Sequence, residues 1–76
     1  MLLNVTLKAR RPLEQMKTLT ARSARVEKAL GKNGRLLVRW SGTEPKLRIM
    51  LEGPNENHLR AWAEELANDA RRDVTS

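Results

Sequence analysis

The sequence predicts an α+β domain of two layers, in which an antiparallel sheet of three to four strands carries two helices on one face. Three observations favour this class. Short segments with the alternating or aliphatic pattern of strands occur three times, longer segments with apolar residues three or four positions apart occur twice, and glycine or proline separates them. In chain order the elements are strand, helix, strand, strand, helix, and the 76 residues make one domain, residues 1–76.

The first predicted strand covers residues 2–8, where apolar and polar residues alternate. A period of two gives such a strand one buried face, here Leu3, Val5 and Leu7. The strand ends before Pro12, which disfavours helical geometry at Arg11 and interrupts strand pairing. We interpret Arg10 and Arg11 as solvated cations in the connection that follows.

A first helix is predicted over residues 13–30, because its apolar residues fall three, seven and four positions apart, with Ser23 in the gap. These residues are Met16, Leu19, Val26 and Leu30. Gly31 follows the last of them directly and predicts the end of the helix, and Asn33 with Gly34 predicts a turn.

Residues 35–40 and 46–52 predict the second and third strands, because both are rich in bulky aliphatic residues and Gly53 with Pro54 ends the later one. The face expected to lie under the helices consists of Leu36, Val38, Trp40, Leu47, Ile49 and Leu51. The opposite face carries Leu37, Arg39, Arg48, Met50 and Glu52. This second face is too apolar for ordinary solvated surface, and we expect it to line a cleft or meet another domain.

The last helix is predicted to begin after Asn55, a suitable N-cap, with Glu56 in its first turn and Arg71-Arg72 in its last turn, where each charge complements the helix dipole. Its apolar face consists of Leu59, Trp62, Ala63, Leu66, Ala70 and Val74. Asp69 and Asp73 lie four positions apart, and we interpret them as part of a solvated helix face rather than as metal ligands.

The turn at residues 41–45 has the composition of an anion-binding loop. Ser41 and Thr43 offer hydroxyl donors, and Gly42 lets the backbone approach a ligand closely or take positive φ. Antiparallel pairing of the flanking strands would bring Arg39 and Arg48 together beside the hydroxyls, and guanidinium groups bind phosphate through paired hydrogen bonds. The pattern therefore predicts a phosphate site, the alternative being a turn whose hydroxyls bond their own backbone.

Composition limits the other classes of function. The formal charge of +6 raises the question of nucleic-acid binding. The arginines are scattered, however, and the chain has no Phe or Tyr and only two tryptophans, Trp40 and Trp62. The sequence therefore lacks the combined basic and aromatic surface that binds single strands. No run approaches the roughly 18 apolar residues of a membrane span, and residues 1–4 are too short for a signal peptide. The absence of cysteine excludes a disulfide framework and agrees with a reducing compartment such as the cytoplasm.

The string RWSGTEP at residues 39–45, followed by Arg48, resembles the phosphate-binding loop of the α-D-phosphohexomutases. The flanking strands, the upstream LLNV and the helix end VEKALGKNG are similar in particular to the C-terminal domain of the phosphoglucosamine mutase branch, over essentially all 76 residues. The resemblance implies an isomerase of amino-sugar metabolism, serving peptidoglycan precursors. Such enzymes interconvert glucosamine 6-phosphate and glucosamine 1-phosphate through a bisphosphorylated sugar, with a phosphoserine and Mg²⁺ held in other domains.

Carried over by position, the resemblance makes Arg39, Ser41, Gly42 and Thr43 the residues that hold the phosphate not undergoing transfer, and Arg48 the second arginine of the motif. Two further residues lie beside them. Glu44 is a supporting residue, and we prefer a role bracing Arg48 over one that bonds the sugar. Trp40 departs from the family pattern, and we expect it to pack or cover rather than to stack on substrate.

The resemblance implies no catalytic residue and no metal ligand in this chain. Asp69 and Asp73 cannot form an aspartate-rich metal loop, and neither Ser23 nor Ser76 lies in a setting like that of the phosphoserine. We therefore expect the chain alone to be inactive, with a phosphosugar and the remaining mutase domains as partners, and neither nucleic acid nor membrane. A small basic nucleic-acid-binding module and a free-standing phosphosugar sensor stay open as alternatives, and phosphomannomutases and phosphoglucomutases share the loop.

Overall fold

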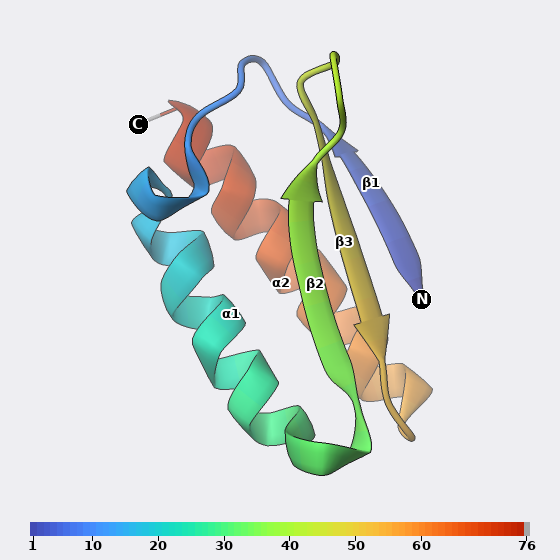
Figure 1. Cartoon of the computed structure of the whole chain (residues 1–76). Helices are drawn as coiled ribbons and strands as arrows, with labels where there is room; N and C mark the ends of the chain where they lie inside the picture. Colours follow the sequence, from blue (N-terminus) through green and yellow to red (C-terminus); the bar gives the residue numbers. More distant parts are fainter. Residues whose placement is uncertain (76) are drawn as a thin grey trace.

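A computed structural model describes residues 1–75 and has two layers, a three-stranded antiparallel sheet and a pair of helices on one of its faces (Figure 1). The elements are β1 (Leu2–Thr6), the 3-10 turn η1 (Leu13–Gln15), α1 (Lys17–Leu30), the 3-10 turn η2 (Gly31–Asn33), β2 (Arg35–Trp40), β3 (Lys46–Glu52) and α2 (Glu56–Thr75). The predicted class and element order are confirmed. Ser76, considered above for a phosphoserine setting, lies outside the described residues.

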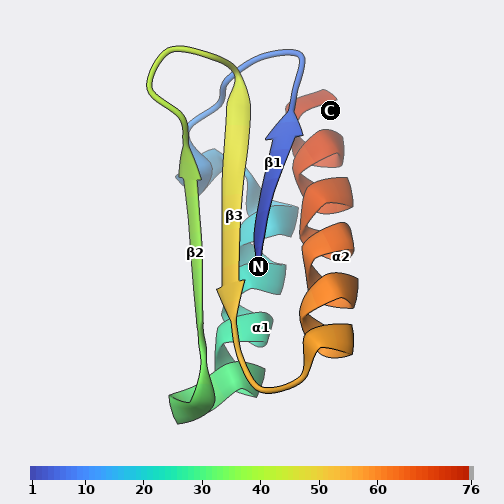
Figure 2. The same cartoon turned by 90° about the vertical axis from the view of Figure 1, so that its right-hand side faces the viewer.

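The sheet has the order β1-β3-β2, so the last strand in sequence is the central one. Its inner residues Leu47, Ile49 and Leu51 are at most 1% exposed, and Leu36, Val38 and Trp40 of β2 lie opposite them in register. Both helices cover this inner face, while the outer face of the sheet is uncovered (Figure 2). The predicted division of the two strands into faces is therefore correct.

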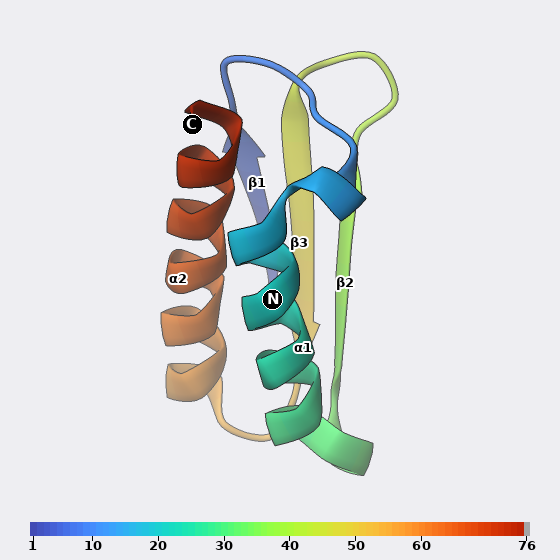
Figure 3. The same cartoon turned by 90° about the vertical axis from the view of Figure 1, so that its left-hand side faces the viewer.

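The hydrophobic core lies between the inner face of the sheet and the two helices, which run side by side (Figure 3). Each layer contributes side chains that are almost fully buried, and the largest are Val5, Met16, Leu19, Leu47, Ile49, Leu51 and Leu66. Removal of such a side chain typically costs about 2–5 kcal/mol. The core thus fixes β2 and β3, and with them the loop that joins these strands.

The helix ends follow the predicted signals in three of four cases. Asn55 caps α2, since its Oδ1 accepts the backbone N–H of His58 at 3.1 Å. Gly31 ends α1 at φ 57°, a value that favours glycine, and the predicted last turn of α2 holds Arg72. The first helix differs, because residues 13–15 form a 3-10 turn and Met16 leaves helical geometry (φ −90°, ψ 76°) while its side chain is fully buried. The α-helix therefore begins only at Lys17.

The interpretation of Asp69 and Asp73 as solvated was wrong, because both are buried against α1, at 4% and 6% exposure. Arg22 of α1 donates hydrogen bonds to Asp69 and to the more exposed Glu65, and the bond to Asp69 is the main cause that raises the pKa of Arg22 above its ordinary value. Asp73 Oδ2 accepts a hydrogen bond from the backbone N–H of Leu19 at 2.8 Å, so a side chain of α2, 54 residues away in sequence, caps the first turn of α1. The two aspartates join the helices to each other.

The basic pair Arg10-Arg11 does more than face solvent: Arg10 is exposed and Arg11 is half-buried, and both side chains bond distant backbone. Arg11 Nη1 donates to the carbonyl oxygen of Asp73 at 2.7 Å, and Arg10 Nη1 donates to the carbonyl oxygen of Gly42 at 2.8 Å. These contacts span 62 and 32 residues of sequence, so no local pattern could predict them. The connection between β1 and η1 is fastened at one side to α2 and at the other to the 41–45 loop.

Candidate functional site

The strand register places the two motif arginines directly opposite each other on the outer face of the sheet. Arg39 of β2 pairs with Arg48 of β3, and Arg48 pairs on its other side with Asn4 of β1. Directly opposed residues have Cβ atoms about 4.5–5.5 Å apart, and like charges in this arrangement are destabilising. The row Asn4, Arg48, Arg39 therefore concentrates positive charge and one amide next to the loop.

The 41–45 loop closes on itself through backbone bonds. Ser41 N–H donates to Lys46 O at 2.9 Å, and Lys46 N–H donates to Glu44 O at 2.7 Å. The Ser41 hydroxyl donates to Glu44 O at 3.2 Å, the own-backbone bonding that was the alternative for this turn. A hydroxyl has one donor and two acceptor lone pairs and can rotate to a new partner, so this bond shapes the loop without excluding a ligand.

Gly42 does not take a positive φ. Gly31 is the only described residue with positive φ, so the expectation that Gly42 takes positive φ was wrong. A Cβ added at Gly42 would have nothing within 4 Å. The other expected use of this glycine, close approach of a ligand to the backbone, stays a prediction, and open space lies where that ligand would come.

A hollow of about 420 Å³, here named the loop hollow, lies beside the 41–45 loop on the outer face of the sheet. Its lining consists of Asn4, Ser41, Gly42, Thr43, Glu44, Lys46 and Arg48. Arg48 also lines a neighbouring hollow of about 150 Å³, together with Leu2, Leu37, Arg39 and Met50. The structure thus brings Ser41, Gly42, Thr43 and Arg48 around one space, and it places Arg39 beside that space rather than in its wall.

Two lining residues, Asn4 and Lys46, were missed in the sequence. Both lie on the outer face, since Asn4 pairs with Arg48 and Lys46 lies two residues before Arg48 on β3. The alternation in the first strand could have assigned Asn4 to that face. What it could not reveal is that β1 pairs with β3, which brings Asn4 to the loop.

Glu44 is placed differently from the preferred expectation that it braces Arg48. Its Oε2 pairs with Lys46 Nζ at 3.3 Å, and both side chains are partly exposed, at 67% and 38%. An exposed pair of this kind contributes at most about 1 kcal/mol. The carboxylate therefore partly offsets the lysine charge at the mouth of the loop hollow, and Arg48 keeps its charge available to a ligand.

Trp40 packs, as expected for it in preference to stacking on substrate. The half-buried ring lies against the hydrophobic core, and its Nε1 donates to the carbonyl oxygen of Arg11 at 2.8 Å. The Arg10 guanidinium carbon lies 5.8 Å from the centre of the ring, within the range of a cation–π contact. The indole thereby joins the strand end to the β1–η1 connection.

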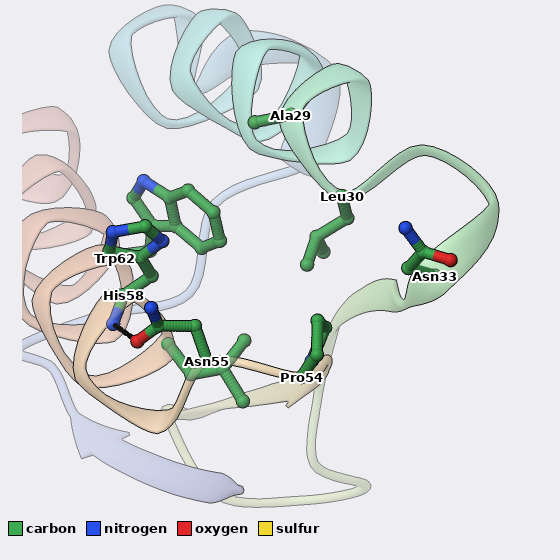
Figure 4. A pocket seen from close by; sticks show the side chains of 8 residues that line it. Ala29, Leu30, Asn33, Pro54, Asn55, His58 and Trp62 are labelled. Carbon is green, nitrogen blue, oxygen red and sulfur yellow. Dashed lines mark hydrogen bonds between the residues drawn. The ribbon is translucent and has the colours of Figure 1, made fainter.

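Another hollow, of about 100 Å³, lies at the other end of the domain, between the end of α1 and the start of α2 (Figure 4). His58 and Trp62 contact each other there, with ring centres 5.5 Å apart, and the Asn55 side chain is used to cap α2. The rest of the wall is mainly aliphatic, with Leu30 and Pro54 prominent (Figure 4). This smaller space offers no cluster of cations, so the loop hollow is the better anion site.

Within residues 1–75 no group of three or more His, Cys, Asp and Glu side chains lies close enough to hold a metal ion. In the same range neither helix combines the length and the apolarity that crossing a membrane requires. The described chemistry of the site is that of hydrogen-bond donors and cations, which suits recognition of an anion.

Residues 2–69 match the sequence family described as phosphoglucomutase/phosphomannomutase, C-terminal domain. The chain is 48% identical over 71 residues to the phosphoglucosamine mutase of Sorangium cellulosum (strain So ce56), which covers 93% of this chain and 15% of that protein. It is also 48% identical over 71 residues to the phosphoglucosamine mutase of Anaeromyxobacter sp. (strain Fw109-5), with the same coverage, and 46% identical over 67 residues to that of Lawsonia intracellularis (strain PHE/MN1-00), covering 88% of this chain and 15% of that protein. The chain therefore spans about 15% of the length of these relatives.

Proposed function

The chain belongs to the family of phosphoglucomutase/phosphomannomutase C-terminal domains, and from this premise we propose that it binds the substrate phosphate in a phosphoglucosamine mutase. The reaction of that enzyme would be the interconversion of glucosamine 6-phosphate and glucosamine 1-phosphate through a bisphosphorylated sugar. A cytoplasmic location and a role in supplying amino sugar for peptidoglycan precursors belong to the same proposal. Phosphomannomutases and phosphoglucomutases share the loop, so the loop alone does not identify the sugar. The choice of glucosamine phosphate is supported by the relatives, which are phosphoglucosamine mutases.

The observation that carries the proposal is the pairing of Arg39 with Arg48 across the strands, next to an open loop hollow. Two guanidinium groups held opposite each other repel, and a doubly charged phosphate between them converts that repulsion into charge-assisted bonds. Ser41 and Thr43 at the rim add hydroxyl donors. The same cations would be a liability on a surface with no anionic partner.

In this proposal the domain anchors and does not perform chemistry. The phosphate that is not transferred is held equally well in the ground state and in the transition state. The residues that hold it are Arg39, Ser41, Gly42, Thr43 and Arg48. Binding of this kind lowers KM and orients the sugar, so that its other phosphate reaches the reacting group in line. We place the phosphoserine and Mg²⁺ in other domains of a longer mutase, and we expect the 76-residue chain alone to be inactive.

The first test is a titration of the 76-residue chain with inorganic phosphate and with glucosamine 6-phosphate, followed by NMR. The backbone amide signals of Ser41, Gly42 and Thr43 should move, with those around His58 as the internal control at the far end of the domain. If the loop amides stay in place at tens of millimolar ligand, where even Kd values above 1 mM are visible, the preformed site is wrong.

The second test uses Arg39→Ala in a complete mutase that contains this domain. An anchoring residue should raise KM with a smaller change in kcat, because its interaction is made before the transition state. Arg60→Ala, an exposed arginine in the early part of α2, is the matched control. An unchanged KM in the Arg39 variant would remove the anchoring role.

Nucleic-acid binding is the second candidate, and the net charge of +6 is what favours it. Against it, Trp40 and Trp62 are both half-buried with core contacts, so neither ring is free to stack on a base. Binding to single-stranded or duplex nucleic acid with a steep salt dependence, centred away from the 41–45 loop, would favour this candidate over the phosphosugar.

A further inference from the structure

We propose that Arg10 is a positioning residue for the phosphate-binding loop, an inference that rests on the proposed function. Arg10 lies in the β1–η1 connection, which passes beside the 41–45 loop at one end of the sheet (Figures 1 and 2). It is absent from the lining of the loop hollow. Its role would be to fix the Gly42–Thr43 peptide so that the Thr43 N–H is available to the anion.

Two contacts hold Arg10 in its place. Its Nη1 donates to the Gly42 carbonyl oxygen at 2.8 Å, and its guanidinium carbon lies 5.8 Å from the centre of the Trp40 ring. The indole is itself fixed, because its Nε1 donates to Arg11 O at 2.8 Å. The guanidinium fork is therefore oriented by an anchored ring before it reaches the loop.

The rest of the loop leaves the Gly42–Thr43 peptide weakly constrained. The strand-side bonds hold Ser41 and Lys46, and Leu7 N–H donates to Pro45 O at 2.8 Å on the other side. Gly42, in contrast, has no side chain, and a Cβ added there would have nothing within 4 Å. A peptide unit next to glycine can rotate at little cost, so the bond from Arg10 is what sets its orientation.

The orientation matters because a trans peptide is planar, and its carbonyl oxygen and its N–H point in opposite directions. With the Gly42 oxygen held toward Arg10, the Thr43 N–H points away from Arg10. If this peptide turned over, its carbonyl oxygen would take the place of the N–H and would repel an anion. Arg10 thus keeps a donor in the loop and occupies the Gly42 carbonyl oxygen, an acceptor that would oppose binding if it faced the anion.

Arginine suits this role better than lysine. The guanidinium stays charged at all ordinary pH values, and it can stack its plane on the indole while one N–H bonds the carbonyl. An ammonium group can bond the carbonyl but has no plane to stack. In this chain Trp40 supplies the ring over which the Arg10 guanidinium lies.

The test compares Arg10→Met with Arg60→Met in the 76-residue chain, using inorganic phosphate as the probe. Both variants remove one exposed positive charge, but only the first removes the bond to Gly42. We expect Arg10→Met to weaken phosphate binding about tenfold, because it removes a charge-assisted hydrogen bond that orders the loop before the anion binds. Arg60→Met should weaken it by less than about twofold. Arg10→Lys should fall between them.

A second measurement follows the internal motion of the loop, which a change of net charge alone would not alter. In phosphate-free buffer, ¹⁵N relaxation should show faster internal motion at Gly42 and Thr43 in Arg10→Met than in the unchanged chain or in Arg60→Met. The Trp40 indole N–H signal should shift in the same variant, because the cation over its ring is gone.

The outcomes separate this inference from the proposed function. If the unchanged chain binds no phosphate, the proposed function is overturned and the inference falls with it. If the chain binds phosphate but Arg10→Met and Arg60→Met weaken binding equally, or the motion of the Gly42–Thr43 segment is unchanged, only the role of Arg10 is overturned.

Discussion

At the scale of single residues, Gly42 is the loop residue whose identity the fold does not require and the proposed function does. Its conformation does not require glycine, because its φ is not positive and no atom lies within 4 Å of an added Cβ. Gly34 is the opposite case, since an added Cβ would lie 2.0 Å from the carbonyl oxygen of Glu52. Packing therefore explains Gly34, whereas no contact of the described chain requires glycine at position 42, which leaves the proposed close approach of a ligand to be tested there.

This contrast gives a prediction for Gly42→Ala. The free energy of unfolding should stay the same or rise by about 0.4–1 kcal/mol, because alanine restricts the unfolded chain without a clash. Phosphate affinity should fall about tenfold, equal to about 1.4 kcal/mol, because the methyl group occupies the space of approach. Urea unfolding and a phosphate titration measure the two effects. Unchanged affinity would show that the missing side chain has no part in binding.

Gly34→Ala should behave in the reverse way. A Cβ at 2.0 Å from a backbone oxygen and 2.9 Å from Leu30 Cδ2 forces the start of β2 away from the end of β3. We expect a loss of about 1–3 kcal/mol in the free energy of unfolding, typical of overpacking, and little change in phosphate affinity of the folded fraction. A variant as stable as the unchanged chain would contradict the close packing at Gly34.

At the scale of elements, α1 and α2 are joined by polar groups as well as by the core. Arg22 bonds Asp69 and Glu65 of α2, and Asp73 caps α1 through Leu19 N–H. The two carboxylate partners of Arg22 differ in burial, since the Asp69 side chain is 6% exposed and that of Glu65 is 47% exposed. A bond in the drier position is worth more, because water competes less for both partners.

We therefore predict unequal effects for Asp69→Ala and Glu65→Ala. Loss of the buried carboxylate should lower the free energy of unfolding by about 1.5–3 kcal/mol, the range for hydrogen bonds to charged groups. Loss of the exposed one should cost less than about 0.5 kcal/mol. Chemical denaturation of both variants measures the difference. Equal effects would mean that the ion pair acts through long-range charge and not through the buried bond.

At the scale of the whole molecule, the sequence predicted what local signals determine. The bounds of β2 and β3, the Asn55 cap and the Gly31 stop follow from residues next to each other in the chain. The family suggested by the RWSGTEP string was confirmed by the match over residues 2–69. What could not be predicted depends on tertiary placement.

The missed features all arise from segments far apart in sequence. Asn4 reaches the loop hollow only because β1 pairs with β3, and Asp69 is buried only because α1 lies on that side of α2. Arg10 reaches Gly42 across 32 residues. Alternation and helical spacing describe one element at a time, so they assign a residue to a face but not to its neighbour on another element.

The pairing of Arg39 with Arg48 leads to a prediction about the stability of the whole domain. In phosphate-free buffer, Arg48→Met should raise the free energy of unfolding by about 0.2–1 kcal/mol, because it relieves the repulsion of two opposed cations. In the unchanged chain, phosphate at one hundred times its Kd should add about 2.7 kcal/mol to that free energy, since it binds only the folded state. Arg48→Met should lose most of this increase.

Thermal or urea unfolding of the unchanged chain, Arg48→Met and Arg60→Met, each with and without phosphate, measures both effects in one experiment. Arg60→Met should keep the full increase with phosphate, because its side chain is exposed on α2, outside the loop hollow. The informative result is the opposite sign of the two effects at Arg48. Substitution of a structural residue would lower the free energy of unfolding in both buffers. Substitution of a binding residue that repels its neighbour should lower it only when the anion is present. A lower stability of Arg48→Met without phosphate, together with an undiminished increase on adding it, would show that the opposed arginines do not form the anion site.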